Sequence, residues 1–484
     1  MKGSSMYRRH FVLAMTCLVS ACSVGPSFRQ PAAPPTDQYT AGEQEQATAV
    51  APGGAGGAQH FVSGAIVPGH WWQAFQCDAL NALVEEALAH SPTLLQARAR
   101  LREAQEKLTA QRRGTLYPAF DAQLGIAREK INPAAFGIAQ IPPQSAFTLY
   151  NAQVNVSYTL DAFGAEQRMI EGTRAQSEYQ SYETEAAELT LAANVVVAAI
   201  RQADLQAEVD YTQQLLQSQE RQIAIGEERY RAGGIALEEL QNQRNQLEQL
   251  RATLPALKAQ RQLIDHQLAV YTGKAPAVAA LPPLELEDLQ LPDELPLTLP
   301  SDLVRRRPDL RASEALWHQA AANVGVATAN LFPNLTLSGY AGSDTTKASD
   351  LVDSLNVWSI GAKLLQPIFH AGELRAKRRS AIAAYDAAAQ AYGQTVLESL
   401  QQVADSLRVL EADALTLQAR TAASEQSAAS YAIARQRFDV GGISELSLLD
   451  AQRQELQTAL DRERAAAQRL ADTAALLHAL AGPV

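Results

Sequence analysis

The side chains that could do covalent or metal chemistry are few and scattered along this chain of 484 residues. Its eight histidines include no HExxH motif and no pair at metal-ligand spacing, and His70 and His90 are expected to be solvated. The serine of GISEL, at 442–446, lacks the pattern of a nucleophile elbow. The glycines of 53–57 follow no strand and precede no Gly-Lys-Ser/Thr, as a phosphate loop would require. The sequence therefore predicts no enzyme, no metal and no bound cofactor.

One cysteine does have the surroundings of a modification site. A positive N-terminus is followed by the uncharged apolar stretch 11–21, which has the length of a signal-peptide core and is too short to span a bilayer. The stretch ends in LVSAC, which resembles the bacterial lipobox, with Cys22 as the residue that receives diacylglycerol and an N-acyl chain. Ser23 in place of Asp favours the outer membrane. The alternative is an ordinary signal peptide with a chance cysteine.

Removal of the predicted signal peptide, residues 1–21, leaves an acidic chain without a possible intrachain disulfide. Only Cys22 and Cys77 remain, and Cys22 is the expected lipid site. The loss of Lys2, Arg8 and Arg9, with no acid removed, takes the formal charge from -11 to -14. Nothing in such a chain supplies a phosphate-neutralising patch, so nucleic acid is not an expected partner.

The elements that would position functional residues occur twice. SPTLLQARARLREAQ at 91–105 matches RPDLRASEALWHQAA at 307–321, and each copy then reaches an aromatic-proline pair, at 117–118 or 332–333. These matches divide the chain into a lipidated linker at 22–78, a first repeat at 79–273, an equatorial linker at 274–304 and a second repeat at 305–484. The first linker is rich in Pro, Gly and Ala, which indicates an extended and mobile segment.

Each repeat contains a segment with period-two alternation, at about 117–161 and 333–367, typical of a β-hairpin. We expect loops at about 128–146 and 342–354, with the first strand of each hairpin the shorter and weaker. At 150–160, apolar residues alternate with Asn, Gln, Ser and Thr, which favours a lipid-facing strand over the cover of a soluble core. Four strands cannot close a membrane barrel, whereas three copies would supply twelve around a water-filled lumen.

Long helices follow the hairpins. Residues 164–231 contain no proline, and at about 1.5 Å per residue they would make a helix of about 100 Å, with apolar residues at coiled-coil spacing. The second copy runs from 372 to 438. Both copies end in a related turn, RYRAGGI at 229–235 and RFDVGGI at 437–443, and a new helix starts at Leu237 or Leu446.

Taken together, these motifs resemble the TolC-type outer-membrane factor family, in its lipoprotein branch of the OprM or NodT type. The resemblance covers nearly the whole chain and rests on the lipobox, WWQAF at 71–75, YTLDAFG at 158–164, LPSDLVRRRPDLRASEA at 299–315, LLQPIFHAG at 364–372 and RFDVGGISELSLLDAQR at 437–453. It implies an α+β membrane protein: a homotrimer whose 12-stranded outer-membrane β-barrel continues into a long periplasmic α-helical barrel.

The resemblance also implies a passive duct that receives small molecules, such as drugs or toxic compounds, from an inner-membrane pump through a periplasmic adaptor. The pump could belong to the resistance-nodulation-division or the major-facilitator class, and the cargo cannot be read from the residues. The alternatives are the port of a type I protein secretion system, or a lipid-anchored coiled-coil scaffold without channel activity.

The same resemblance places a periplasmic gate near the second tip, at Phe438, Leu446 and Asp450. Three Asp450 carboxylates would favour cations, and three Leu446 side chains would make a dewetting constriction. From the residues alone, Asp450 could instead pair with Arg453 on its own helix. The first copy carries other residues at the places of Leu446 and Asp450, namely Glu238 and Asn242. The residues expected to dock the adaptor are Arg229, Gly233, Gly234, Arg437, Gly441 and Gly442.

Overall fold

The computed structural model describes residues 24–41, 45–130, 132, 145–351 and 355–482. The predicted signal peptide and Cys22 lie outside these residues. The chain is mostly helical and divides into two compact units. Unit 1 comprises Met1–Gln30, Leu101–Gln180 and Ser313–Tyr392, and unit 2 comprises Pro31–Arg100, Ser181–Ala312 and Gly393–Val484.

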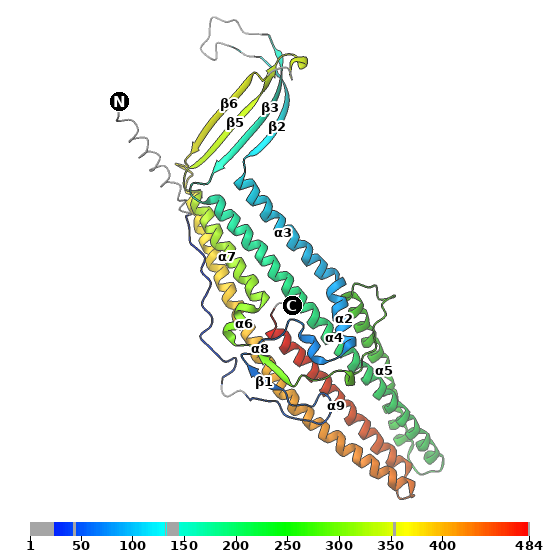
Figure 1. Ribbon diagram of the computed structural model, residues 1–484. Helices are drawn as coiled ribbons and strands as arrows, with labels where there is room; N and C mark the ends of the chain where they lie inside the picture. Colours follow the sequence, from blue (N-terminus) through cyan, green and yellow to red (C-terminus); the bar gives the residue numbers. More distant parts are fainter. Residues whose placement is uncertain (1–23, 42–44, 131, 133–144, 352–354, 483–484) are drawn as a thin grey trace. The chain divides into compact units, whose positions relative to one another are not determined.

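Unit 1 contains a four-stranded antiparallel sheet in the order β2-β3-β5-β6 (Figure 1). Its strands are β2 (Ala119–Glu129), β3 (Phe147–Leu160), β5 (Asn334–Thr345) and β6 (Val357–Leu365). The turn η4 (Ala348–Asp350) lies between β5 and β6. Of the second pair, β5 is the longer, with 12 residues against 9, so the expected short first strand is wrong there. Glycines interrupt the alternation of apolar and polar residues in 338–342, yet these residues still pair with β6. The sequence pattern therefore predicted too short a first strand.

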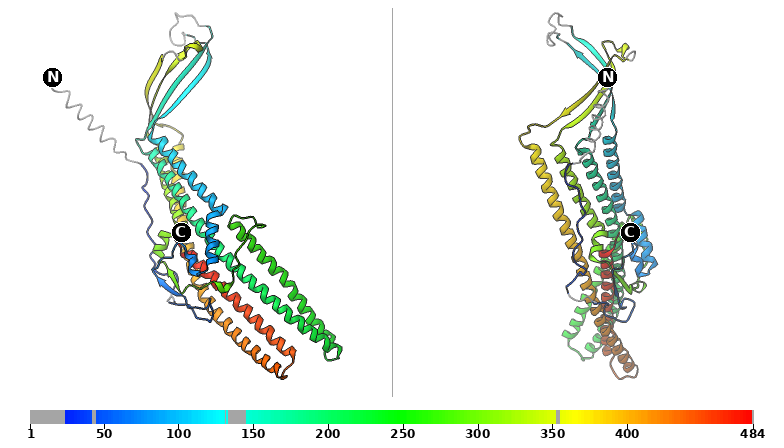
Figure 2. Two further views of the ribbon diagram at one scale, coloured as in Figure 1. Left: turned by 45° about the vertical axis from the view of Figure 1, so that its right-hand side comes forward. Right: turned by 60° about the vertical axis from the view of Figure 1, so that its left-hand side comes forward.

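Four helices enter unit 1: α3 (Pro92–Leu116), α4 (Ala165–Arg231), α7 (Pro308–Ala329) and α8 (Glu373–Asp439). The two longest, α4 and α8, have 67 residues each, which is about 100 Å of helix. Figure 2 shows α3 and α8 on opposite sides of this group, with α4 and α7 between them. An aromatic cluster joins α7 to α8, since the Trp317 ring lies 5.8 Å from Tyr385 and 5.7 Å from Tyr392.

Unit 2 contains the helical hairpins and a small mixed region. Each of α4 and α8 ends in a tight turn and is followed by an antiparallel partner, α5 (Leu237–Tyr271) or α9 (Glu445–Leu480) (Figure 1). The mixed region holds η1 (Trp71–Phe75), α2 (Asp78–His90), η3 (Leu286–Asp288), α6 (Pro300–Arg306), and a parallel pair of β1 (His60–Ser63) with β4 (Glu294–Leu297). Trp71, Trp72 and Phe75 are almost completely buried in its core.

The expected mobile linker is instead packed along much of its length. Ala47 forms a β-bridge with His60. The backbone N–H and C=O groups of β1 find hydrogen-bond partners in β4, which belongs to the equatorial linker. The fully buried Arg469 of α9 donates to the carbonyls of Ala55, at 3.1 Å, and Gly57, at 2.9 Å. The composition suggested mobility, but a buried guanidinium needs hydrogen-bond acceptors, and backbone carbonyls of this segment supply them.

Among the described residues, one helix is long and apolar enough to cross a membrane by length and composition alone. It is α4, and 56% of its most apolar 18-residue stretch is buried. Burial of that kind is found in the core helices of packed proteins. The expected solvent exposure of His70 and His90 is found in the structure, while the unpaired Cys77 is buried.

Candidate functional site

One face of the four-stranded sheet is apolar in all four strands and is exposed. The register places Phe120 opposite Val156, Val154 opposite Ala341, and Ala341 opposite Trp358. The side chains of Leu124, Ile126, Trp358 and Ile360 are 74–83% exposed. An apolar surface of this extent on an exported chain is the surface that lipid would cover.

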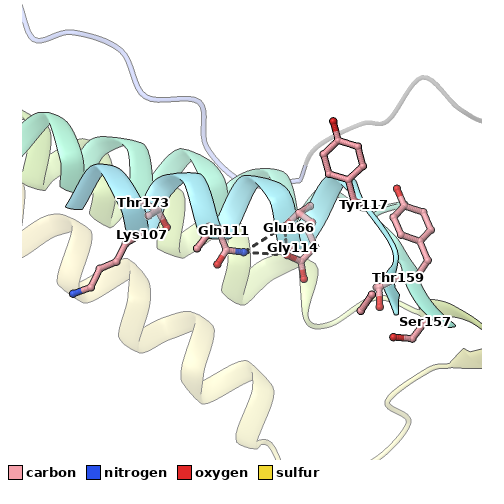
Figure 3. Close-up of a pocket in the computed structure, with 12 residues that line it drawn as sticks. Lys107, Gln111, Gly114, Tyr117, Ser157, Thr159, Glu166 and Thr173 are labelled. Atoms are coloured by element: carbon pink, nitrogen blue, oxygen red, sulfur yellow. Dashed lines mark hydrogen bonds between the residues drawn. The ribbon is translucent and has the colours of Figure 1, made fainter. Parts of the chain in front are cut away.

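The opposite face is polar and continues onto the helices. Ser157 and Thr159 of β3 line a groove of about 620 Å³ together with residues of α3 and α4 (Figure 3). In this groove Glu166 accepts hydrogen bonds from Thr115 Oγ1, at 3.0 Å, and from Gln111 Nε2, at 3.4 Å. The polar surface of the sheet therefore meets polar residues of the adjoining helices in this groove.

Within the described residues, the sheet has two unpaired edges. β2 pairs only with β3 and β6 pairs only with β5, so each outer strand leaves one side of its backbone without a partner. Unpaired strand edges cannot persist in lipid, where each unsatisfied group costs several kcal/mol. The two edge strands therefore need a partner wherever lipid surrounds the sheet.

The two helical tips have closely similar backbone geometry, as the repeated turn suggested. Gly233 and Gly441 both have φ of +75°, and the amides of Gly234 and Gly442 donate to the carbonyls of Arg229 and Arg437, each at 2.7 Å. These six predicted docking residues are exposed and lie together within their tips. The next helices begin differently, since Ser444 caps α9 by accepting from the Ser447 amide, while Ala236 gives α5 no side-chain cap.

The three predicted gate residues come from the two arms of the second tip. Phe438 lies in the last turn of α8 and is half-buried, Leu446 lies in the first turn of α9 and is half-buried, and Asp450 is exposed one turn later. Asp450 has two partners. It accepts a hydrogen bond from Gln222 Nε2 of α4, at 3.0 Å, and its Oδ1 lies 3.9 Å from Arg453 Nη2.

A second contact beside Asp450 also joins the tip to α4. Arg221 Nε donates to Glu445 Oε1 over 2.6 Å. Arg221 and Gln222 were not among the sequence-predicted residues, because their partners are 224 and 228 positions away and no local pattern links them. The second tip is thus held to the first hairpin by two adjacent polar contacts.

A buried charge cluster lies along the same pair of helices. Asp204 and Glu208 of α4 are both 4% exposed and pair with Arg201, while Arg464 of α9 donates to Glu208 over 2.7 Å. Desolvation is the main cause that raises the pKa of Asp204 to about 6, and the Arg201 charge opposes it. This cluster joins α4 to α9 in addition to the contacts at the tip.

The residues just after Cys22 are held in place beside the sheet. Arg168, at the start of α4, donates to the carbonyl of Val24 over 3.3 Å and to that of Gly25 over 3.4 Å. Gly25 has φ of +102°, and a Cβ there would come within 2.5 Å of Gly325 Cα. Val24 is two residues after the predicted lipid site, and its amide donates to Phe163 O. The chain therefore reaches the base of β3 directly after that site.

In the described part of the chain, no three His, Cys, Asp or Glu side chains gather in a group that could hold a metal ion.

Comparison with known proteins agrees with this geometry. The outer membrane efflux protein family matches residues 83–274 and 299–482, which is well over half of the chain. The pyoverdine export outer membrane protein OpmQ of Pseudomonas aeruginosa is 28% identical over 385 residues, covering 79% of this chain and 81% of its own. Outer membrane protein OprJ of the same species is 28% identical over 452 residues, covering 91% of this chain and 88% of its own. The solved outer-membrane channel OprN has a TM-score of 0.79 at 27% identity, covering 95% of this chain and 99% of its own. This chain belongs to the outer membrane efflux protein family.

Proposed function

We propose that three copies of this outer-membrane channel subunit assemble into a 12-stranded β-barrel continuous with a helical barrel in the periplasm, each copy contributing both halves of a tandem repeat. The observation that carries the proposal is the four-stranded sheet with one exposed apolar face and two unpaired edges. Two copies would give eight strands and little lumen, whereas three give twelve and a water-filled one. The match of the family to two separate blocks of the chain supports the repeat.

The duct would conduct its cargo passively. A pump in the inner membrane would supply the driving force, a periplasmic adaptor would connect the pump to the helical tips, and the polar sheet face and the groove at Glu166 would line a wet path. OpmQ is named for pyoverdine export, so related channels serve a defined small molecule, while the cargo here would be set by the pump. The pump would be of the resistance-nodulation-division or the major-facilitator class.

The alternatives fit less well. A lipid-anchored scaffold would give no reason for an apolar sheet face opposite a polar one. The family that the chain matches is described as efflux proteins and not as ports for protein secretion. Since the family consists of channels, we assign no catalytic role to the chain.

Cys22 would carry the lipid anchor. The carbonyls of Val24 and Gly25 accept hydrogen bonds from Arg168, and the Val24 amide donates to Phe163, three residues after β3. These contacts support an anchor close to the sheet that would enter the membrane. Acyl chains attached there would reach the inner leaflet of the outer membrane without an intervening linker.

Adaptor docking would use the exposed backbone at the two glycine pairs, 233–234 and 441–442, with Arg229 and Arg437 beside them. The two tips are nearly equivalent in backbone geometry, so an adaptor hairpin could dock against each in the same way.

The gate would be closed by the second tip. In a trimer, Phe438, Leu446 and Asp450 would surround the axis, and the Gln222–Asp450 and Arg221–Glu445 contacts would hold each tip inward. Opening would require both contacts to break. The partners belong to different hairpins, and Arg221, Glu445 and Asp450 are partly exposed, while Gln222 is buried.

The test is the mass of the purified protein in detergent, followed by its single-channel conductance in planar bilayers. We expect a trimer with a small, mostly closed conductance that rises severalfold in Asp450→Ala and further in Asp450→Ala/Leu446→Ala. The matched control is Asp210→Ala, which removes an exposed carboxylate that accepts from Gln206 of its own helix. Unchanged conductance in well-folded Asp450→Ala trimers would remove Asp450 from the gate. A monomer without conductance would overturn the barrel and favour the scaffold.

A further inference from the structure

The segment that connects β6 to α8 carries two large apolar side chains that nothing in the described chain covers. Ile368 is 94% exposed and Phe369 is 85% exposed. The segment is a defined turn, because Gln366 Nε2 donates to Leu331 O over 3.2 Å and Ala371 and Gly372 both have positive φ. In the first copy, the segment between β3 and α4 carries Phe163, which instead stacks on Phe332 at 4.8 Å.

A cluster of basic residues follows at once in the first two turns of α8. Residues 373–379 carry four basic side chains against one acid, a formal charge of +3, whereas the equivalent 165–171 of the first copy carry two acids and one arginine. Lys377 is paired with Glu373 at 2.6 Å. Arg375, Arg378 and Arg379 are exposed and make no hydrogen bond or ion pair with the described residues.

This placement works against the stability of the isolated helix. Arg375 lies in the first turn, where the helix dipole favours negative charge, and it is spaced three and four residues from Arg378 and Arg379, which puts like charges on one face. Fold stability therefore does not account for these arginines, while an anionic partner would.

The apolar and basic residues meet in one groove of about 400 Å³. Leu331, Pro367, Ile368 and Phe369 form its apolar part, and His370 and Arg375 form its polar part. The groove lies directly after Leu364, which is 67% exposed and is the last residue of β6 on the apolar face of the sheet. A molecule with an acyl chain and an anionic headgroup matches this order of surfaces along the chain.

We propose that this groove and the arginines beside it bind anionic phospholipid of the periplasmic leaflet of the outer membrane, with the phosphate on Arg375, Arg378 and Arg379 and the acyl chain on Ile368 and Phe369. The inference rests on the proposed membrane insertion of the sheet. In the proposed trimer, β6 would pair with β2 of an adjacent copy, and the base of β2 follows the exposed Arg112 and Arg113 of α3. Closure therefore adds positive charge at this level, which strengthens the attraction for an anionic headgroup.

The test is native mass spectrometry of the purified protein with phosphatidylglycerol or phosphatidylcholine of the same acyl chains. We expect the wild type to retain phosphatidylglycerol about tenfold better, since each basic residue near an anionic lipid adds attraction. The triple variant Arg375→Gln/Arg378→Gln/Arg379→Gln should lose this preference. The control Arg100→Gln/Arg102→Gln/Lys258→Gln removes the same charge from exposed sites elsewhere and should keep it.

Other outcomes would overturn the lipid assignment. Equal retention of the two lipids, or a triple variant that behaves as the wild type, would contradict the proposed lipid site. Full displacement of the lipid by millimolar inorganic phosphate would assign the site to free phosphate. Ile368→Ser/Phe369→Ser should weaken lipid retention in intact trimers. If these trimers dissociated with the lipid preference unchanged, the two residues would be a contact between copies. A monomer that still preferred phosphatidylglycerol would support the lipid site and overturn the trimer.

Discussion

At the scale of single residues, the buried Arg469 shows how one side chain orders a long stretch of backbone. Its guanidinium is fully buried and donates to Thr48 Oγ1, at 2.8 Å, and to two carbonyls of the N-terminal segment. Desolvation lowers the pKa of Arg469, and the nearby Asp413 charge opposes that effect. The arginine and the segment therefore depend on each other for burial.

Replacement of this arginine should release the segment. Arg469→Met keeps much of the volume but leaves the Ala55 and Gly57 carbonyls without their donor, at a cost of roughly 3 kcal/mol. We expect faster proteolysis within residues 45–59, measured by limited digestion and mass mapping. Arg408→Met, at an exposed arginine paired with Glu411 on the same helix, should leave the digestion pattern unchanged. A pattern unaltered by Arg469→Met would show that β1 and its pairing suffice to hold the segment.

The carboxyls of Asp413 and Asp472 predict a pH dependence. Desolvation, followed by the hydrogen bond and charge of Asp472, raises the pKa of Asp413 to about 7. The folded chain then binds more protons than the unfolded chain between about pH 4 and 7, so stability falls as pH rises through this window and stays lower above it. The melting temperature should be higher at pH 6 than at pH 8. Asp413→Asn should reduce this difference and Asp210→Asn should not; an equal difference in all three proteins would contradict the assignment.

At the scale of elements, the glycine tips explain why the same turn occurs twice. A helix that must reverse within a few residues needs one residue with positive φ, and Gly233 and Gly441 supply it without a Cβ penalty. The following glycine is also constrained, since a Cβ on Gly442 would lie 3.1 Å from Arg437 O. Glycine here serves the turn whether or not an adaptor docks.

Gly441→Ala should therefore loosen the second tip. A left-handed alanine costs about 1 kcal/mol, which corresponds to roughly fivefold faster hydrogen exchange of the tip amides. The matched control is Gly393→Ala in the interior of α8, where an added Cβ meets nothing within 4 Å, and it should stabilise the helix slightly. Equal exchange in Gly441→Ala and wild type would mean that the surrounding bundle holds the tip regardless of the cap.

At the scale of the whole molecule, the sheet determines where the protein resides. In every strand one face is apolar and the other is polar. The sheet is therefore amphipathic and requires lipid on one side and water on the other. The helical hairpins, with their buried charges and hydrogen-bonded tips, are suited to an aqueous compartment. Localisation in the outer membrane with the helices in the periplasm follows from this division, and the family to which the chain belongs shares it.

Adjacent residues of β6 provide a direct test of the two faces. Ile360→Arg places a charge on the apolar face, which should cost about 2–4 kcal/mol near the centre of a membrane and reduce assembled trimer in outer-membrane fractions. Ser359→Arg, one residue earlier and on the polar face, should assemble normally. Native gels of the two variants make the comparison, and equal assembly would contradict the assignment of the apolar face to lipid.

The sequence by itself determined the local features of the fold. Proline-free helical periodicity, paired glycines and period-two alternation depend on neighbouring residues, so the long helices, their tips and the presence of two strand pairs could be predicted. The tertiary structure decided the features that join distant residues, including the order β2-β3-β5-β6, the Gln222–Asp450 contact and the packing of the linker around Arg469. These depend on which surfaces meet across two hundred residues or more. Burial and hydrogen-bond satisfaction decide that outcome, and neither quantity exists until the chain is folded.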